Sequence, residues 1–184
     1  MAEYKFPTEV VNLPSKGKLY PKDNPLSKGE VELKYMTAKE EDILTSINLI
    51  RKGIVIDKVI ESLIVDKKIK IDDLLIGDKN ALMISARILG YGKEYNVKAS
   101  CSECGKSGDL KVDCTQLKDI EISDDIKENK FSMKLPATKV EIEFKLLNSA
   151  EEILVEKDVE AMQKVHPDID YTNTFRFKKN DCLN

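Results

Sequence analysis

Hydrophobic positions in the first half of the chain recur with the 3.6-residue period of an α-helix. Thr37 and Glu40 have the spacing of a capping box, which predicts a helix start at this point. A left-handed stop at Gly53 would end this helix. Its apolar face is formed by four residues: Ile43, Leu44, Ile47 and Ile50.

Two further helices are predicted in the same half. The second has apolar residues at the i, i+3, i+4, i+7 and i+8 positions of one face: Ile56, Val59, Ile60, Leu63 and Ile64. A short helical turn is expected over residues 72–75, and Gly77-Asp78 then reads as a break followed by an N-cap. The third helix, residues 81–89, is apolar nearly all round, which is typical of a buried central helix, and Gly90 and Gly92 would end it.

The segment before these helices is rich in proline. Four of the six prolines fall within the first thirty residues. Proline removes a backbone donor and favours extended conformations, so an extended arm is predicted, with one edge strand at residues 30–34. Such arms can be stabilised by a neighbouring subunit.

After Tyr95 the hydrophobic period changes from 3.6 to 2, the period of a β-strand. Residues 95–99 and 110–114 alternate between apolar and polar, which predicts a hairpin with Cys101 and Cys104 near its tip. A charged connector, residues 118–130, is expected to be an exposed loop. A second hairpin is predicted from the alternation on either side of residues 136–139.

Ser149 and Glu152 have capping-box spacing and predict a last helix, which would end near His166-Pro167. The tail beyond residue 167 carries no assignable pattern. The predicted fold class is α+β, with an extended N-terminal arm and small helical bundle, then β-hairpins and a C-terminal helix. The corresponding segments are an arm (1–35), a helical bundle (36–93), a hairpin region with the CxxC tip (94–147), and a C-terminal helix and tail (148–184).

Composition narrows the classes of protein that fit. Hydrophobic residues make up 41% and charged residues 34%, which is typical of a folded, water-soluble chain. No apolar run reaches the roughly 18–20 residues of a membrane-spanning helix, and the first residues do not form a secretion signal. Lys and Arg are interspersed with Asp and Glu, with a net charge of -3, so general nucleic-acid binding is not favoured. The expected location is the cytoplasm of a cell.

The Cys101-Ser-Glu-Cys104-Gly105 turn is the one metal-like motif in the sequence. A tight turn of this kind directs two thiolates at one ion, so the sequence is compatible with a bound zinc ion. No cofactor is predicted to be required. A closed zinc site needs four ligands, and the further candidates are Cys114, His166 and Cys182, or residues of a partner chain. Cys114 shares strand parity with apolar neighbours, which equally favours a place in the core.

Other chemistry is less favoured. His166 precedes a proline at a predicted helix end, with no nucleophile tied to it by motif, so no catalytic residue is predicted. A thiol oxidoreductase would place its CxxC at a helix N-terminus, whereas this one lies between strands. A zinc-dependent nucleic-acid-binding module is a further alternative, and it would use the hairpin lysines Lys98, Lys106 and Lys111.

Several blocks, taken in order along about residues 10–160, resemble one protein family. They are residues 13–21 (LPSKGKLYP), residues 36–45 (MTAKEEDILT), residues 77–81 (GDKNA) and residues 88–95 (ILGYGKEY), followed by the CxxC. The family comprises the baseplate hub and hub-assembly proteins of T-even-type contractile-tailed bacteriophages. The resemblance implies a non-catalytic baseplate protein made in the host cytoplasm. It also implies more helix after residue 165 than this tail shows.

The resemblance implies partners among other baseplate and hub proteins, with several copies in an assembly and neither nucleic acid nor membrane as a partner. The protein would then act as a hub subunit of the virion tail or as a factor that assembles the hub. Aromatic and apolar residues contribute large contact areas at interfaces. The predicted surface anchors are Leu19, Tyr20, Tyr91 and Tyr95. Packing within their own chain is an equally good interpretation for Tyr91 and Tyr95.

Overall fold

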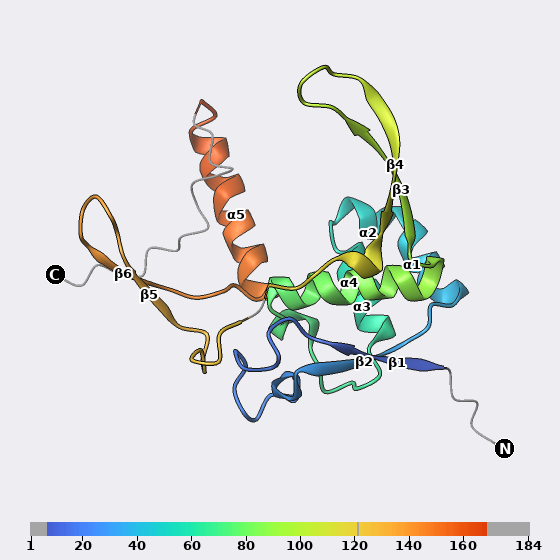
Figure 1. The fold of residues 1–184 in the computed structure, drawn as a ribbon, viewed down its shortest axis with the longest axis horizontal. Helices are drawn as coiled ribbons and strands as arrows, with labels where there is room; N and C mark the ends of the chain where they lie inside the picture. The colour runs from blue at the N-terminus through green and yellow to red at the C-terminus, as the bar shows by residue number, and fades with distance from the viewer. Residues whose placement is uncertain (1–6, 121, 169–184) are drawn as a thin grey trace.

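The computed structural model describes residues 7–120 and 122–168. This part of the chain combines α-helices with two-stranded antiparallel sheets, so the predicted α+β class is confirmed (Figure 1). The α-helices are α1 (Ala38–Thr45), α2 (Ile47–Arg51), α3 (Val55–Leu63), α4 (Ile76–Tyr91) and α5 (Ser149–Val165). The strands are β1 (Thr8–Asn12), β2 (Glu30–Lys34), β3 (Glu94–Ser100), β4 (Ser107–Asp113), β5 (Phe131–Lys134) and β6 (Glu141–Phe144). Short 3-10 helices are η1 (Pro25–Lys28), η2 (Ile71–Asp73) and η3 (Cys114–Gln116).

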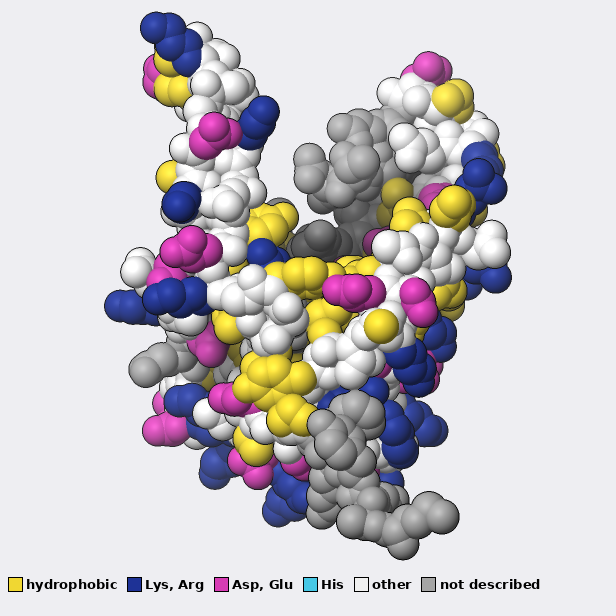
Figure 2. All heavy atoms as spheres, turned by 90° about the vertical axis from the view of Figure 1, so that its right-hand side faces the viewer, with side chains coloured by type: hydrophobic (Ala, Val, Ile, Leu, Met, Phe, Trp, Pro, Cys, Tyr) yellow, Lys and Arg dark blue, Asp and Glu magenta, His cyan; other side chains and the backbone are white. Residues whose placement is uncertain are grey.

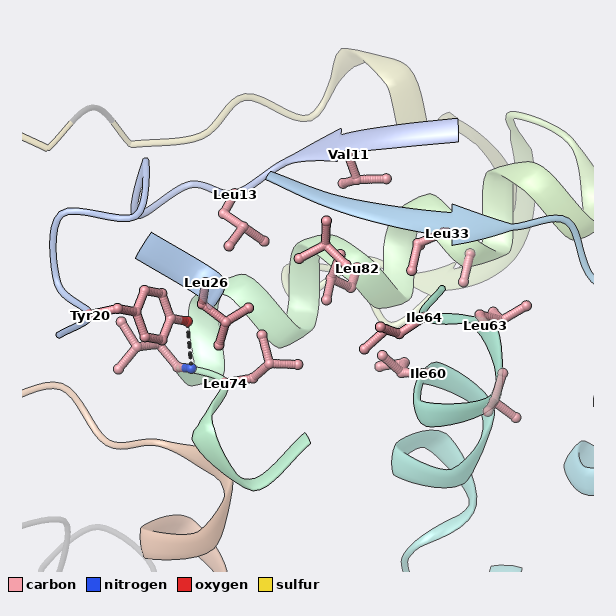
Figure 3. Packing of buried hydrophobic residues seen from close by; sticks show 14 of the residues in the cluster. Val11, Leu13, Tyr20, Leu26, Leu33, Ile60, Leu63, Ile64, Leu74 and Leu82 are labelled. Atoms are coloured by element: carbon pink, nitrogen blue, oxygen red, sulfur yellow. Dashed lines mark hydrogen bonds between the residues drawn. The ribbon is translucent and has the colours of Figure 1, made fainter. Parts of the chain in front are cut away.

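The core lies between the β1–β2 hairpin and the helices α3 and α4 (Figure 3). Strands β1 and β2 pair antiparallel with Val11 opposite Val31, and their alternating apolar side chains point to one face. Below that face, Leu82 of α4 and Ile60 of α3 are almost completely buried. Full burial of one such side chain contributes about 1.5–3 kcal/mol, so each buried residue of this layer adds substantially to stability.

The proline-rich segment is extended, as predicted, but it is not a free arm. Leu13 is 2% exposed and Leu26 is 0% exposed, because both side chains fill the core beneath the hairpin. The loop between the strands crosses itself at Gly17 and Gly29. Gly17 has φ 72° and a Cβ there would lie 2.3 Å from the Ser27 carbonyl oxygen, so only glycine fits. Gly17 therefore allows the two backbone segments to pass close to each other.

A buried polar network joins this loop to the start of α4. The Asp78 carboxylate is 1% exposed and accepts hydrogen bonds from the Ser15 N–H (2.9 Å) and the Tyr20 hydroxyl (2.6 Å). The Tyr20 oxygen in turn accepts from the Leu75 N–H at 3.0 Å. Burial, the Asp78 charge and the hydrogen bond to Asp78 together raise the pKa of Tyr20 well above its usual range. Tyr20 therefore stays protonated and bridges two segments 55 or more residues apart.

The boundaries of α4 correct two predictions. Gly77 and Asp78 lie inside its first turn, and Leu75 is the N-cap, so Asp78 is not a cap. Gly90 also lies within the helix, and a Cβ there would come 2.4 Å from the Met36 sulfur, so glycine makes room for a packed side chain. Gly92 is the C-cap, as predicted. The helix is central (Figure 1), but its burial is one-sided, since Met83 and Tyr91 are exposed.

The predicted first helix is two helices. Thr37 begins α1 with the expected capping box, but the backbone at Ser46 is extended (ψ 105°), and α2 then starts in a new direction. As a result Ile43 packs against the core, whereas Ile47 and Ile50 of α2 are 64% and 51% exposed. The continuous apolar stripe predicted from the sequence is therefore divided. The α3 stripe is confirmed for four of its five predicted residues, Val59, Ile60, Leu63 and Ile64, whereas Ile56 is exposed.

The second half of the chain forms both predicted hairpins. β3 pairs with β4, and β5 pairs with β6 with Phe131 opposite Phe144, whose rings stack at 5.4 Å between centroids. The connector is mostly exposed coil, but Ile122 and Ile126 pack against the core, so part of it is anchored. The cap of α5 is shifted by one residue from the prediction: Asn148 and Glu151 form the capping box. Residues 169–184, including the predicted tail, lie outside the described residues.

A second buried carboxylate, Glu40, ties α1 to its neighbours. It is 0% exposed and accepts hydrogen bonds from Lys34 Nζ (3.0 Å), Ser62 Oγ (2.6 Å) and the Thr37 N–H (2.9 Å). Burial alone would raise the pKa of Glu40, but hydrogen bonds from Ser62, Thr37 and Lys34 outweigh it and lower the pKa to about 2. Strand β2, helix α1 and helix α3 are therefore held at one point by an ionised group.

Replacing Tyr20 with Phe should lower the free energy of unfolding by about 1–3 kcal/mol, because Asp78 and the Leu75 N–H each lose a buried partner. Urea unfolding followed by circular dichroism measures the change. The control is Tyr91→Phe on a half-exposed ring, with an expected effect within about 0.5 kcal/mol. Equal stabilities of the two variants would contradict the bridging role of Tyr20.

Replacing Glu40 with Gln should lower the free energy of unfolding at neutral pH by about 1–3 kcal/mol. The folded-state pKa, about 2, lies below the ordinary value of 4.5, so this stabilisation is complete above pH 4.5 and is lost as the pH falls towards 2. Urea unfolding of both proteins across that range should show the difference shrinking with falling pH. A difference that stays constant would exclude the ionised carboxylate as its source, and the exposed Glu41→Gln provides the matched control.

Candidate interaction surfaces and metal centre

The β3–β4 hairpin projects from the body of the protein (Figure 1). Its strands pair over seven positions, from Glu94 opposite Asp113 to Ser100 opposite Ser107. Side chains from residue 98 to residue 111 are all exposed, so the outer part of the hairpin makes little contact with the core. A two-stranded sheet is marginal by itself in water, so its position must be set at its base.

Arg87 of α4 holds that base. Its guanidinium group donates to the carbonyl oxygens of Gly92 (2.9 Å) and Glu94 (3.2 Å). The same group lies over the rings of Tyr91 and Tyr95, 5.0 and 5.4 Å from their centroids. Sequence reasoning selected the two tyrosines but missed Arg87, although its i, i+4 spacing to Tyr91 on one helix is a usable signal.

The predicted surface anchors divide into two pairs. Tyr91 and Tyr95 are 51% and 47% exposed, so each ring keeps an accessible area beside its contact with Arg87. Leu19 and Tyr20 are 5% and 9% exposed, so the expectation that they lie on the surface was wrong. Leu19 and Tyr20 pack within their own chain, because the loop that carries them folds back over the start of α4.

The cysteine motif forms a tight turn at the hairpin tip. The Gly105 N–H donates to the Cys101 carbonyl oxygen and the Cys101 N–H donates to the Lys106 carbonyl oxygen, both at 2.9 Å. Gly105 has φ 68°, a conformation that glycine adopts without strain. Hydrogen bonds from the Cys104 and Glu103 N–H groups, and then from the Cys104 thiol, lower the pKa of Cys101. The two thiols therefore lie side by side and are exposed.

The structure separates the other candidate ligands from this turn. Cys114 follows the far end of β4, and seven strand residues span roughly 20 Å, so it does not share an ion with Cys101 and Cys104. His166 is the C-cap of α5. Within residues 7–120 and 122–168, no group of three or more His, Cys, Asp or Glu residues is placed to hold a metal ion. Cys182 lies outside the described residues.

The cysteine turn also bears on the oxidoreductase alternative. The turn joins two strands, so no helix dipole acts on Cys101, and the shift of its pKa comes from local N–H donors. A lowered thiol pKa is common to metal-binding and redox-active cysteines. The pKa shift therefore does not favour the redox interpretation over a metal site.

Apolar side chains are exposed on several projecting elements. Leu154, Met162 and Val165 of α5 are 52%, 40% and 70% exposed. Their spacing of eight and eleven residues places all three on one helix face. Other exposed apolar residues lie on α2 and around the β5–β6 hairpin: Ile47, Ile50, Met133, Val140, Phe144 and Leu146. Figure 2 shows hydrophobic side chains gathered in a hollow between two projecting parts of the molecule.

Among the described residues, contacts to the body of the protein lie at the base of α5. The Ser149 N–H donates to the Leu74 carbonyl oxygen at 2.9 Å, and the Ile76 N–H donates to the Leu147 carbonyl oxygen at 3.2 Å. Beyond this junction the helix points away from the body (Figure 1), and every side chain from residue 160 to residue 168 is exposed. Its apolar face thus has no cover among the described residues.

A groove of about 580 Å³ lies where the N-terminal loop approaches the β6–α5 junction. Several of its polar groups have structural partners. Asn148 accepts from the Glu151 N–H as a helix cap, and Lys145 pairs with the Glu151 carboxylate. Asn24 and Asp73 lie 3.5 Å apart across the groove wall. The polar side chains that line the groove are therefore explained by helix capping and loop packing.

A family model described as "T4 bacteriophage base plate protein" matches residues 5–175. The chain belongs to this family. The resemblance to T-even baseplate proteins is thereby confirmed at the level of the family. Searches of curated proteins and of solved structures found no match.

The matched residues include the core, the β3–β4 and β5–β6 hairpins and α5. Every helix and strand described above therefore lies within the part of the chain that matches the family. Membership of this family indicates a structural role in the phage tail baseplate. Such a role involves contacts with other baseplate proteins. No helix in the described part of this base plate protein is both long and apolar enough to cross a membrane.

Replacing Arg87 with Lys should loosen the base of the β3–β4 hairpin, since an ammonium group cannot reach two carbonyls with the geometry of a guanidinium fork. Hydrogen exchange followed by mass spectrometry should become faster in residues 94–99 and stay unchanged in α3. Lys106→Ala, at the exposed tip of the same hairpin, is the control. Unchanged exchange at the hairpin base would show that Arg87 does not hold it.

Proposed function

We propose that this baseplate protein acts in the hub of the baseplate, either as a structural subunit or as a factor that assembles the hub. It does so through protein–protein contacts and without catalysis. The observation that carries the proposal is the uncovered apolar face of α5, on a helix that projects from a well-packed body. Family membership supports the baseplate as the setting.

The distribution of exposed apolar area supports an interface. The body of the protein buries its apolar side chains efficiently, with Leu26, Leu33, Leu63, Leu74 and Leu82 all 0% exposed. The projecting elements do the opposite, and Val165 at the end of α5 is 70% exposed. Exposed apolar side chains grouped on one face are typical of a surface that a partner covers. A projecting helix with an apolar stripe fits a groove on a neighbouring subunit.

The charge pattern of the hairpin supports protein contacts over nucleic acid. Lys98 lies opposite Asp109 in the strand register, and Lys111 Nζ lies 4.0 Å from a Glu94 carboxylate oxygen. Phosphate binding needs clustered positive charge without neighbouring carboxylates. These lysines instead belong to a surface of mixed sign, so the alternative of a nucleic-acid-binding module has no supporting observation.

The composition of purified virions separates the two forms of the hub proposal. Mass spectrometry of the particles should detect the chain in stoichiometric amount with other baseplate proteins if it is a hub subunit. If it is an assembly factor, the chain should be absent from particles and should be recovered with hub proteins from infected cells. Absence from both fractions would overturn the proposal.

Replacing Leu154 and Val165 together with Lys should abolish assembly while the protein still folds, because both side chains are exposed on the α5 face. In a phage lacking the gene, complementation by the variant should fall at least about tenfold, which corresponds to about 1.4 kcal/mol or more of lost association free energy if yield follows association. Plaque yield and electron microscopy of baseplates are the measurements.

The matched control is Gln163→Lys, an exposed position on the opposite face of the same helix that adds the same charge per site. Its complementation should equal that of the unmodified chain. Circular dichroism and thermal unfolding confirm that both variants fold. Full complementation by the Leu154→Lys/Val165→Lys protein would exclude α5 as an interface.

A further inference from the structure

We propose that the Cys101–Cys104 turn is one half of a tetrahedral zinc site, and that the other half is the same turn of a second copy of the chain. The zinc ion would be held by four cysteine sulfurs, two from each hairpin tip. This inference concerns a metal-linked dimer and does not depend on a role in the hub.

The turn is built as a two-sulfur ligand. The Gly105 N–H to Cys101 carbonyl bond and the Cys101 N–H to Lys106 carbonyl bond, both 2.9 Å, close the turn, and the Cys104 thiol lies next to Cys101 Sγ. The N–H groups of Glu103 and Cys104 donate to Cys101 Sγ, and such donors fix the orientation of a ligand. The hydroxyls of Ser100 and Ser107, 2.8 Å apart, close the strands directly below the turn. The pair of sulfurs is thus held in place before any metal binds.

Zinc in a structural site takes four ligands in tetrahedral geometry, and four cysteines are a common set. The turn supplies two of them, and no further donor of the described chain lies close enough to make a cluster of three. Cys114 is excluded by the length of β4. Two ligands must therefore come from elsewhere, and a twofold-related copy supplies an identical pair without any additional kind of residue.

The position of the turn allows two copies to meet. The hairpin carries the turn away from the body (Figure 1), and both thiols are exposed. Side chains from residue 98 to residue 111 are exposed, so no described element covers the tip. Charge at the tip is also compatible with pairing. Each tip carries one lysine, Lys106, and one carboxylate, Glu103, so two approaching tips have no net charge to repel each other before the metal binds.

Binding is a proton exchange and involves no oxidation. Four thiols lose four protons to the solvent as one Zn²⁺ forms four Zn–S bonds. Formation of a Cys101–Cys104 disulfide would instead remove two electrons and prevent zinc binding. The experiment is therefore performed with a phosphine reductant present.

The test uses the full chain, purified under reducing conditions and given one equivalent of zinc. Zinc content measured by plasma mass spectrometry and molecular mass from native mass spectrometry should give one zinc per two chains and a dimer. Chelation should return the monomer. Cobalt in place of zinc should produce the visible absorption of a tetrahedral four-sulfur site.

Replacing both Cys101 and Cys104 with Ser should remove the zinc and the dimer together. Both side chains are exposed at a tip outside the core, so the thermal unfolding of the variant monomer should match that of the metal-free protein. Cys114→Ser and Cys182→Ser are the matched controls, and both should retain one zinc per dimer.

Three outcomes would overturn the proposal. A monomer with one zinc per chain would place the remaining ligands within the same chain. Loss of zinc in Cys182→Ser would identify one of them. Failure to bind zinc under reducing conditions would leave the turn as a structural feature of the hairpin only.

Discussion

The buried Asp78 carboxylate is the contact on which the arrangement of the first half of the protein depends. It lies inside the first turn of α4, where the helix dipole favours negative charge, and it accepts hydrogen bonds from Ser15 and Tyr20. A buried charge is tolerated only when its hydrogen bonds are satisfied. The loop between β1 and β2 must therefore return to α4, and its return closes the apolar layer over Leu82.

Glu40 has the same role on the other side of the core. Its carboxylate joins β2, α1 and α3 through Lys34, Thr37 and Ser62. Two buried anions thus fix the hairpin and the helices around one apolar centre. This rigid body explains how α5 and the β3–β4 hairpin can project with little support of their own, since each is attached at its base by a few directed contacts. Projections attached in this way suit the contacts with neighbouring subunits that we propose for α5.

Several elements followed from the sequence because their signals are local. The two-residue alternation specified both C-terminal hairpins, and the 3.6-residue period specified α3, since one buried face is enough to define each element. The cysteine turn at a hairpin tip was predicted from spacing alone. By contrast, the break at Ser46 has no proline or glycine to mark it, and the stripe of Ile43, Ile47 and Ile50 is consistent with one continuous helix. α1 packs against α3, a long-range contact that the local pattern does not contain.

The sequence by itself therefore determined the class of fold, the hairpins, most helices and the membership of a family that the ordered blocks indicated. Only the tertiary structure decided which hydrophobic residues are inside. Leu19 and Tyr20 are indistinguishable by composition from surface anchors, and they are buried because Asp78, 58 residues from Tyr20, provides a partner. Leu154 and Val165 have a pattern suited to a core, yet they are exposed because no other element of the described residues lies beside them. Burial depends on long-range contacts, and a local pattern does not contain them.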